Sequence, residues 1–474
     1  MNIKRTIILL NILALSLACM LFISCKGKSM NGMLIITQVK GDIQNLNFIT
    51  GEDWRYTPEA QLALLDPNKP ASLKVLTDDF YSACSPEISF DGKYMLFAAQ
   101  KKNGAPWQIW EMNLENLKTK QITSSSENCI DPAYLPGGRL VFSKLTANDS
   151  LKAGHSLFTC NLDGSDIKRI TFNPHSYFAS NVLNDGRILT ITRQLYPYQG
   201  NPFFVILRPD GTKAELFYKG PDGGILSGCG WETMNGKIIF VESDNENKGN
   251  LISIKYNRPL HTRVNLTSEI NGDFHSVFPQ YSGRLLVSYR HSEADRYALY
   301  GFDPENKILG QAIYSNADYN VLGAVVVEEH NRPRKLPSEV DLHVKTGLLL
   351  CQDINIPDPQ TLKNAPSRKK AGKIEVLGLN SSLGIVQVEE DGSFYLKAMA
   401  DTPFRIQTLD ENGKVLNESC AWIWLRPNER RGCVGCHEDN ELVPENRVPL
   451  SVKKPPVIIP VHIEKIKEKT VELE

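Results

Sequence analysis

The stretch 85–97, SPEISFDGKYMLF, decides the fold. An apolar segment leads into Asp91-Gly92, and a second apolar segment that ends in Phe97 leads away from it. An Asp-Gly pair between two such segments is a strong signal for a tight β-hairpin turn. We therefore expect two antiparallel strands here.

The same pattern recurs along the first two thirds of the chain. The further copies are 131–142 (DPAYLPGGRLVF), 184–189 (NDGRIL), 235–240 (NGKIIF) and 282–287 (SGRLLV). Between them lie second strand pairs, at 109–114, 157–164 and 204–207, so each unit is a four-stranded meander. A repeat of about forty residues with four strands per unit is typical of a β-propeller, in which neighbouring blades complete each other's cores.

A sixth blade is expected from the two ends of this region. Apolar segments at 34–38 and 62–65 supply strands, and the segment 321–327 closes the ring. The repeats resemble the PD40 or TolB-like repeat, so the predicted fold class is all-β: a six-bladed propeller over 26–328. This fold alone does not indicate a function.

The N-terminus predicts export. Lys4 and Arg5 precede a mostly apolar run from Ile7 to Ile23, as in a signal peptide. The stretch 22–25, FISC, resembles a bacterial lipobox, which would make 1–25 the signal peptide and Cys25 the lipidated first residue. Cleavage before Cys19 and an uncleaved membrane anchor are the alternatives. We expect a membrane-anchored lipoprotein of the bacterial cell envelope, on the periplasmic side or at the outer membrane.

The charges and the cysteines exclude some classes of function. With 53 Lys+Arg and 54 Asp+Glu, the net charge of −1 provides no field that would attract nucleic acid. The 10 cysteines are too dispersed for a disulfide scaffold. By their distance from the turn glycines, Cys84, Cys129, Cys229 and His275 are predicted to begin inner strands at one mouth of the propeller. Simple packing there is favoured over a metal site or a Cys84–Cys129 disulfide.

A second domain is expected after a linker at 329–340, which is rich in proline and basic residues. Alternating apolar residues at 386–388, 394–398, 404–406 and 422–424 predict a small β-sandwich over 341–448, followed by a C-terminal tail at 449–474.

The last predicted strand of this domain runs into the stretch 433–437, CVGCH. The thiols of Cys433 and Cys436 are spaced so that each can add to one vinyl group of a porphyrin, and His437 then stands over the iron as an axial ligand. This predicts one covalent haem c. A zinc site would need two further ligands and would strain the adjacent Cys436 and His437. A thioredoxin-like redox pair would need a βαβ unit, which the pattern does not predict.

The domain resembles the middle domain of the hydrazine synthase alpha subunit family. The resemblance is carried by the stretches 345–353 (KTGLLLCQD), 391–394 (DGSF), 401–403 (DTP), 409–413 (LDENG) and 430–438 (RRGCVGCHE). It implies a haem attached through Cys433 and Cys436, behind a six-bladed propeller. In that family the motif histidine is associated with zinc, and a tyrosine four residues later ligates the iron.

Two departures from the family limit what the resemblance implies. The tyrosine is replaced here by Glu441, and 449–474 holds no second haem motif. Hydrazine synthesis is therefore not expected. The sixth iron ligand stays open: Met399 lies where relatives tend to have proline, and His330, His343 and His462 are the nearest other imidazoles.

Two functions follow from the sequence. The first is a lipid-anchored c-type haem protein with a redox or small-molecule role, whose propeller could receive a redox or protein partner. The alternative is a non-catalytic binding or scaffold lipoprotein, in which the CxxCH loop is structural or binds zinc. The sequence does not decide whether the protein is an enzyme.

Overall fold

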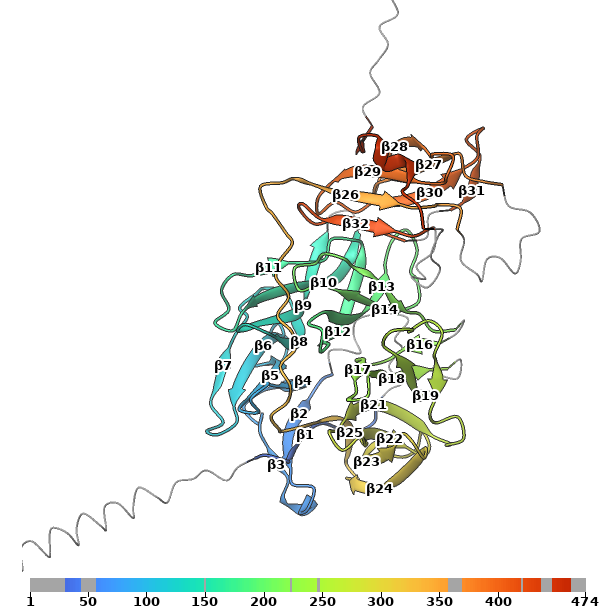
Figure 1. Ribbon diagram of the computed structural model, residues 1–474. Coiled ribbons are helices and arrows are strands. Elements are labelled where there is room, and N and C mark those ends of the chain that lie inside the picture. Colours follow the sequence, from blue (N-terminus) through green and yellow to red (C-terminus); the bar gives the residue numbers. More distant parts are fainter. Residues whose placement is uncertain are drawn as a thin grey trace, which may run out of the picture.

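The computed structural model describes residues 30–43, 57–148, 151–221, 224–244, 248–356, 369–418, 421–435 and 446–461. Within these ranges the regular structure is β-strand, apart from two short 3-10 turns, η2 (Pro70–Ser72) and η3 (Leu450–Lys453). Figure 1 shows a ring of small sheets with a second domain against one side of it.

The propeller consists of six sheets, each formed mainly by consecutive strands of the chain. Blade 1 contains β25 (Tyr319–Val326), β1 (Leu34–Lys40), β2 (Ala60–Leu65) and β3 (Lys74–Val75). Blade 2 contains β4 (Ser82–Ile88), β5 (Tyr94–Gln100), β6 (Gln108–Asn113) and β7 (Thr119–Gln121). Blade 3 contains β8 (Cys129–Leu135), β9 (Arg139–Asn148), β10 (Leu151–Asn161) and β11 (Lys168–Arg169).

The remaining blades follow in the same order. Blade 4 contains β12 (His175–Val182), β13 (Ile188–Gln194), β14 (Phe203–Leu207) and β15 (Glu215–Tyr218). Blade 5 contains β16 (Ile225–Leu226), β17 (Trp231–Glu232), β18 (Lys237–Ser243), β19 (Gly249–Lys255) and β20 (Val264–Asn265). Blade 6 contains β21 (Asp273–Pro279), β22 (Leu285–Arg290), β23 (Ala298–Asp303) and β24 (Ile308–Tyr314).

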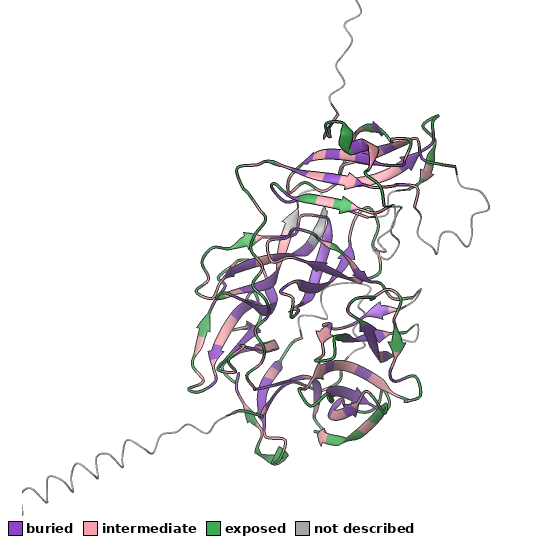
Figure 2. Cartoon of the chain, in the orientation of Figure 1, coloured by how far each residue is buried: buried purple, intermediate pink, exposed green. Residues whose placement is uncertain are grey.

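The ring closes within blade 1. Strand β25, which follows blade 6 in the chain, pairs antiparallel with β1, so that Leu34 lies opposite Val326. This confirms the predicted six-bladed propeller and its closing segment. The inner and middle strands of the blades are mostly buried, as Figure 2 shows, because each blade packs its apolar faces against its neighbours.

The innermost strands of blades 2, 3 and 4 share a bulge. Ser85, Asp131 and Ala179 have positive φ angles of 54°, 52° and 50°, and the hairpin register shifts around each of them. The buried Asp131 carboxylate accepts hydrogen bonds from Ser85 Oγ at 3.1 Å and from the Ala179 backbone N–H at 2.9 Å. One side chain therefore joins the inner strands of three blades.

The segment after β25 crosses the first-hairpin turns of several blades on its way to the second domain (Figure 1). The backbone N–H groups of His330, Asn331 and Arg334 donate to Phe90 O, Tyr281 Oη and Asn184 O, which belong to blades 2, 6 and 4. The linker is thus bonded to the propeller along its length.

The second domain consists of two four-stranded sheets. The first has the order β32 (Arg430–Cys433), β26 (Thr346–Cys351), β29 (Phe394–Met399) and β33 (Val457–Ile459). The second has the order β28 (Ser382–Gln387), β27 (Lys373–Leu377), β30 (Arg405–Leu409) and β31 (Val415–Asn417). Their facing side chains form one core, which confirms the β-sandwich.

Two details of this domain differ from the sequence prediction. The segment around Trp422 and Trp424 is not a regular strand: only Ile423 forms an isolated bridge, with Phe404. Both tryptophans are buried, and Trp424 packs into a core cluster of blades 3 and 4, so their alternation reflects an interface. The segment assigned to a C-terminal tail contributes β33, which pairs parallel with β29.

Candidate functional site

The CxxCH motif begins at the end of an edge strand. Cys433 is the last residue of β32 and is half-buried against the core of the sandwich. Cys436 and His437 lie outside the described residues, as does the predicted lipidation site Cys25. The structure therefore describes how the chain enters the motif.

Strand β32 is held by strand β26, with which it pairs in parallel. Leu348 N–H donates to Glu429 O at 2.8 Å, and Gln352 N–H donates to Cys433 O at 2.9 Å. In this register Cys433 lies directly opposite Cys351, a buried residue that is 1% exposed. The backbone of Cys433, the first cysteine of the motif, is thus held by β26, and Cys351 lies beside it.

A buried carboxylate stands immediately before β32. The side chain of Glu429 accepts hydrogen bonds from Arg431 Nε at 2.9 Å and Nη2 at 2.8 Å, and from the Arg426 backbone N–H at 2.7 Å. Glu429 is 1% exposed, and its partners compensate for the cost of burying the charge. This network fixes the start of the strand that carries Cys433.

The same carboxylate connects the domain to blade 4. The Lys213 backbone N–H donates to Glu429 Oε1 at 2.8 Å, and Arg426 Nε donates to Asp210 O at 2.9 Å. Nearby, Trp422 Nε1 donates to Tyr196 O at 2.7 Å. The strand that leads into the CxxCH motif is therefore positioned by the propeller as well as by its own sheet.

The chain is anchored again after the motif. Arg447 Nη1 forms an ion pair with Asp391 at 2.9 Å, and the Leu450 N–H donates to the same carboxylate at 2.8 Å. The Ser451 N–H donates to Ser393 Oγ at 3.0 Å. These contacts fix the point at which the segment between Cys433 and Arg447 returns to the sheet.

The predicted sixth ligands are not gathered around Cys433. Met399 pairs with Thr346, whereas Cys433 pairs with Cys351 at the opposite end of β26. At about 3.3 Å per residue this separates them by roughly 17 Å. His330, in the linker, packs against Phe90 of blade 2, and burial lowers the pKa of His330. His343 is exposed, and His462 lies outside the described residues.

Glu87 is a titratable group of the propeller that no sequence motif marks. It lies on the inner strand β4, between Pro86 and the buried Ile88. Burial raises the pKa of its carboxyl from 4.5 to about 8. The carboxyl is therefore mainly protonated at neutral pH. A charged residue inside an inner strand was the signal that could have found it.

Glu87→Gln is expected to flatten the dependence of stability on pH. Between the unfolded pKa of 4.5 and the folded pKa of about 8, the folded state holds a proton that the unfolded state has released. Stability therefore falls as pH rises through this window, by up to about 1 kcal/mol per pH unit, and glutamine removes this contribution. Urea unfolding from pH 5 to 8.5 measures this pH dependence of the free energy of unfolding. The control is Glu115→Gln, which changes an exposed glutamate. Parallel curves for wild type and Glu87→Gln would contradict the assignment.

His175 was also missed, because it lies further from its turn glycine than the other inner-strand candidates. It begins β12, is buried, and its Nδ1 lies 3.1 Å from Thr192 Oγ1. Burial lowers its pKa from 6.5 to about 3, so the ring is neutral at physiological pH. Tyr177 and Phe203 rings flank it.

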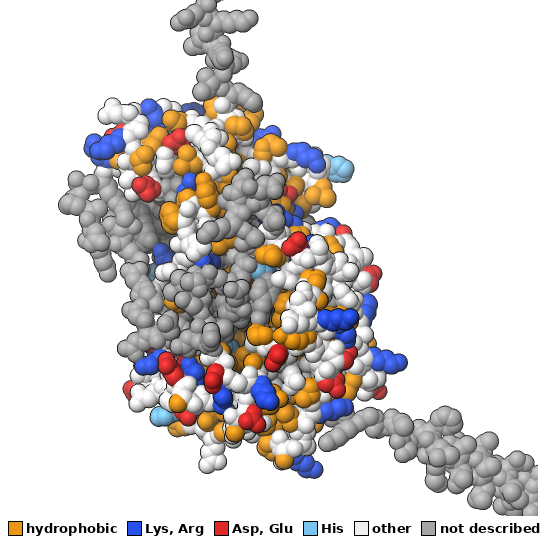
Figure 3. Space-filling model, turned by 180° about the vertical axis from the view of Figure 1, so that it is seen from behind, with side chains coloured by type: hydrophobic (Ala, Val, Ile, Leu, Met, Phe, Trp, Pro, Cys, Tyr) orange, Lys and Arg blue, Asp and Glu red, His pale blue; other side chains and the backbone are white. Residues whose placement is uncertain are grey.

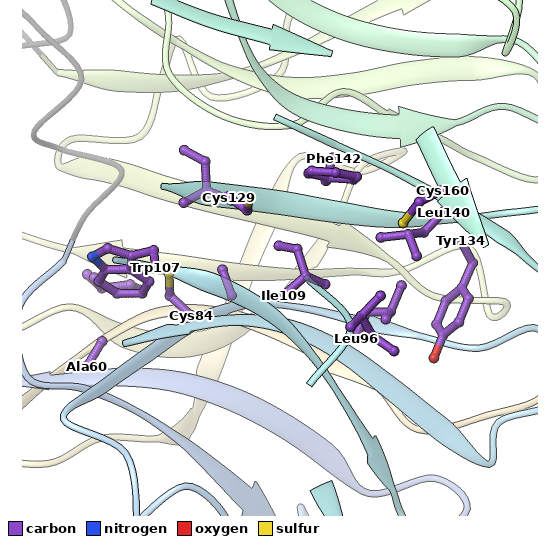
Figure 4. Close-up of a cluster of buried hydrophobic side chains, with 14 of the residues drawn as sticks. Ala60, Cys84, Leu96, Trp107, Ile109, Cys129, Tyr134, Leu140, Phe142 and Cys160 are labelled. Atoms are coloured by element: carbon purple, nitrogen blue, oxygen red, sulfur yellow. The ribbon is translucent and has the colours of Figure 1, made fainter. Parts of the chain in front are cut away.

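Three cysteines of the propeller, including the two predicted inner-strand residues Cys84 and Cys129, are packed in the core. Cys84 and Cys129 lie on β4 and β8 around Trp107, with Cys160 at the other end of the cluster beside Leu140 (Figure 4). All three are present as thiols. Burial raises the pKa of the Cys129 thiol to about 11, as expected for an inert core cysteine.

Of the other two residues predicted to begin inner strands, His275 lies on a strand and Cys229 does not. His275 lies on β21, and its Nδ1 is 2.9 Å from Leu322 O, whereas Cys229 falls between β16 and β17 rather than on a strand. In the part of the chain that the structure describes, no three His, Cys, Asp or Glu side chains are grouped as metal ligands would be.

The described surface is mixed in charge. On the face in Figure 3, basic and acidic side chains are interspersed over the propeller. Among the described residues, no helix has the length and apolar character that crossing a membrane requires.

Comparisons with known proteins agree with this architecture. Residues 358–438, which include the CxxCH motif, match the sequence profile of the hydrazine synthase alpha subunit middle domain. The hydrazine synthase subunit alpha of Kuenenia stuttgartiensis is 24% identical over 511 aligned residues, covering 81% of this chain and 63% of that protein. The chain thus spans less than two thirds of the length of this relative.

One solved structure shares this fold over most of the chain. Kuenenia stuttgartiensis hydrazine synthase matches with a TM-score of 0.74 and 20% identity, covering 89% of this chain and 71% of that chain. TolB from Acinetobacter baumannii matches with a TM-score of 0.44 and 14% identity, covering 61% and 65%. The chain is thus similar in sequence to the hydrazine synthase alpha subunit, most specifically in the middle domain, and it shares the fold of hydrazine synthase.

Proposed function

We propose that this chain is an exported, lipid-anchored c-type haem protein with a redox or small-molecule role. One covalent haem would be held by the thiols of Cys433 and Cys436, with His437 as a ligand of its iron. The observation that carries the proposal is the anchoring of the motif: Cys433 ends a strand bonded to β26, and Arg447 and Leu450 fix the returning chain on Asp391.

The donor set fits this group. Two thiols separated by two residues, followed by an imidazole, are the groups that attach and ligate a c-type haem. Cys433 is half-buried on the strand at the edge of its sheet. When bound, the haem supplies one-electron or ligand-binding chemistry at its iron.

The role of the surrounding residues is to hold the motif. Glu429 and its arginine partners fix the strand that enters it, and blade 4 fixes Glu429. The propeller then offers a surface for a redox or protein partner. The lipid on Cys25 attaches the protein to a membrane of the cell envelope, on the periplasmic side or at the outer membrane.

The proposal does not extend to hydrazine synthesis. Glu441 stands four residues after His437, where the resemblance implies an iron-ligating tyrosine. The unusual iron coordination of that family is therefore not expected here.

The test is covalent haem attachment. The full chain is produced in a bacterial host with c-type haem maturation, denatured, and separated from free haem. Haem absorbance should remain with the polypeptide at about one haem per chain. The Cys433→Ser, Cys436→Ser double variant should lose it completely, whereas Cys84→Ser, which changes a thiol of the propeller core, should retain it.

Two outcomes would redirect the assignment. Wild-type protein without attached haem, or with bound zinc in its place, would overturn the proposal and favour a binding or scaffold role. If haem is attached, absorbance shifts on adding cyanide or carbon monoxide would show an iron with an open sixth position. Their absence would indicate a sixth protein ligand and electron transfer.

A further inference from the structure

Cys351 and Cys433 form an in-register pair on neighbouring parallel strands. Residues directly opposite each other in a sheet point to the same face, and both of these pack against the same core. Adjacent strands lie about 4.8 Å apart. That spacing falls within the roughly 4.4–6.8 Å between Cα atoms that a disulfide spans. Both residues are present as thiols in this structure.

The two cysteines differ in how many neighbouring strands hold them. Cys351 is 1% exposed on β26, which has a neighbour on each side, whereas β32 is a four-residue strand at the sheet edge with one neighbour. An edge strand moves with the loss of few contacts. The small approach that a sulfur–sulfur bond needs is therefore available to Cys433.

We propose that Cys351 is a second sulfur partner of Cys433, and that the haem-free protein closes a reversible Cys351–Cys433 disulfide. The bond holds the first thiol of the CxxCH motif away from Cys436 until the haem is attached. Its competition with haem rests on the proposed function, whereas the disulfide itself does not.

The chemistry balances with an external oxidant. The two thiols lose two protons and two electrons as the S–S bond forms, and a disulfide-bearing thiol oxidase of the cell envelope accepts the electrons and becomes a dithiol. A dithiol reductant reverses the step. Haem attachment then adds the S–H of Cys433 across a vinyl group: a C–S bond forms, and the hydrogen goes to the adjacent carbon without any oxidant.

The position of the pair favours a reversible bond over a structural one. Side chains opposite each other on parallel strands stand further apart than the roughly 3.8 Å between Cβ atoms of a relaxed disulfide. The bond therefore carries strain, and strained disulfides are more easily reduced. Cys433 can thus be returned to the thiol that attachment requires.

The direct test is disulfide mapping of the haem-free full chain. The protein is exported in a host without c-type haem maturation, and its thiols are alkylated before denaturation and trypsin digestion without reductant. We expect peptide 346–363 joined to peptide 432–447, and the joined peptide should persist in Cys436→Ser and vanish in Cys433→Ser. A Cys433–Cys436 disulfide, or full alkylation of Cys351 and Cys433, would overturn the proposal.

A second arm tests the competition. In a host with haem maturation, adding a dithiol reductant should raise the haem-bearing fraction of wild type at least twofold, and should leave Cys351→Ala unchanged. Cys160→Ala, which alters another buried cysteine, should respond like wild type. If no variant carries haem, the proposed function fails, and the peptide map still decides the disulfide. An equal response of wild type and Cys351→Ala would refute the competition.

Discussion

Glu429→Gln is expected to lower the free energy of unfolding by about 3 kcal/mol, because breaking a buried ion pair leaves its partner charge uncompensated. In this variant Arg431 loses its carboxylate partner. The backbone N–H groups of Arg426 and Lys213 each donate to one Glu429 oxygen, and one of them would face the glutamine NH2 group, which cannot accept a hydrogen bond. The contact between the domains should loosen first. Urea unfolding followed by tryptophan fluorescence measures this, since Trp422 and Trp424 lie at the interface.

The control for this variant is Glu339→Gln. Glu339 also contacts the blade 4 turn, where its carboxylate lies 3.0 Å from Lys213 Nζ, but it is exposed. Exposed ion pairs contribute about 0–1 kcal/mol, so this change should have little effect. A loss of stability that is equal in the two variants would show that burial of Glu429 does not fix the domain contact.

The propeller could be predicted because its signals are local and repeated. Each blade needs a tight turn between two apolar strands, and Asp91-Gly92 and its four counterparts mark that turn directly in the sequence. The closing of the ring also followed, since the segments 34–38 and 321–327 were the apolar stretches left over. Both are paired in blade 1.

The contacts between the domains could not be predicted in this way. Lys213 and Glu429 are separated by 216 residues, and no spacing within either segment indicates that they meet. The alternation of Trp422 and Trp424 predicted a strand for the same reason. Large side chains at every second position give the same sequence pattern whether they face the core of a sheet or an interface with another domain.

The candidate site was predicted to a similar extent. The spacing within the motif predicts Cys433, Cys436 and His437 as a haem site from five consecutive residues, and this stays a prediction. The position of Cys351 opposite Cys433 depends on the register of two parallel strands, and the sequence does not specify that these strands pair. The shifted pKa values of Glu87 and His175 arise from desolvation in the folded propeller, which no residue spacing encodes.

Gly186→Ala is expected to cost about 3 kcal/mol or more, since it adds a steric clash to backbone strain. Gly186 has a φ of +90°, and a Cβ on it would lie 2.0 Å from Arg334 O in the linker. The linker would have to leave the first-hairpin turn of blade 4. Trypsin should then cut after Arg334 or Lys335 at least severalfold faster than in wild type.

Gly283→Ala separates the two contributions, because Gly283 occupies the same turn in blade 6. Its φ is +82°, and a Cβ there would meet nothing within 4 Å. This variant should therefore cost only the roughly 1–2 kcal/mol of a left-handed alanine, with an unchanged rate of linker cleavage. If the two variants lose equal stability and cleave alike, the linker does not press on blade 4. The difference between them otherwise measures how firmly the propeller holds the segment that leads to the second domain.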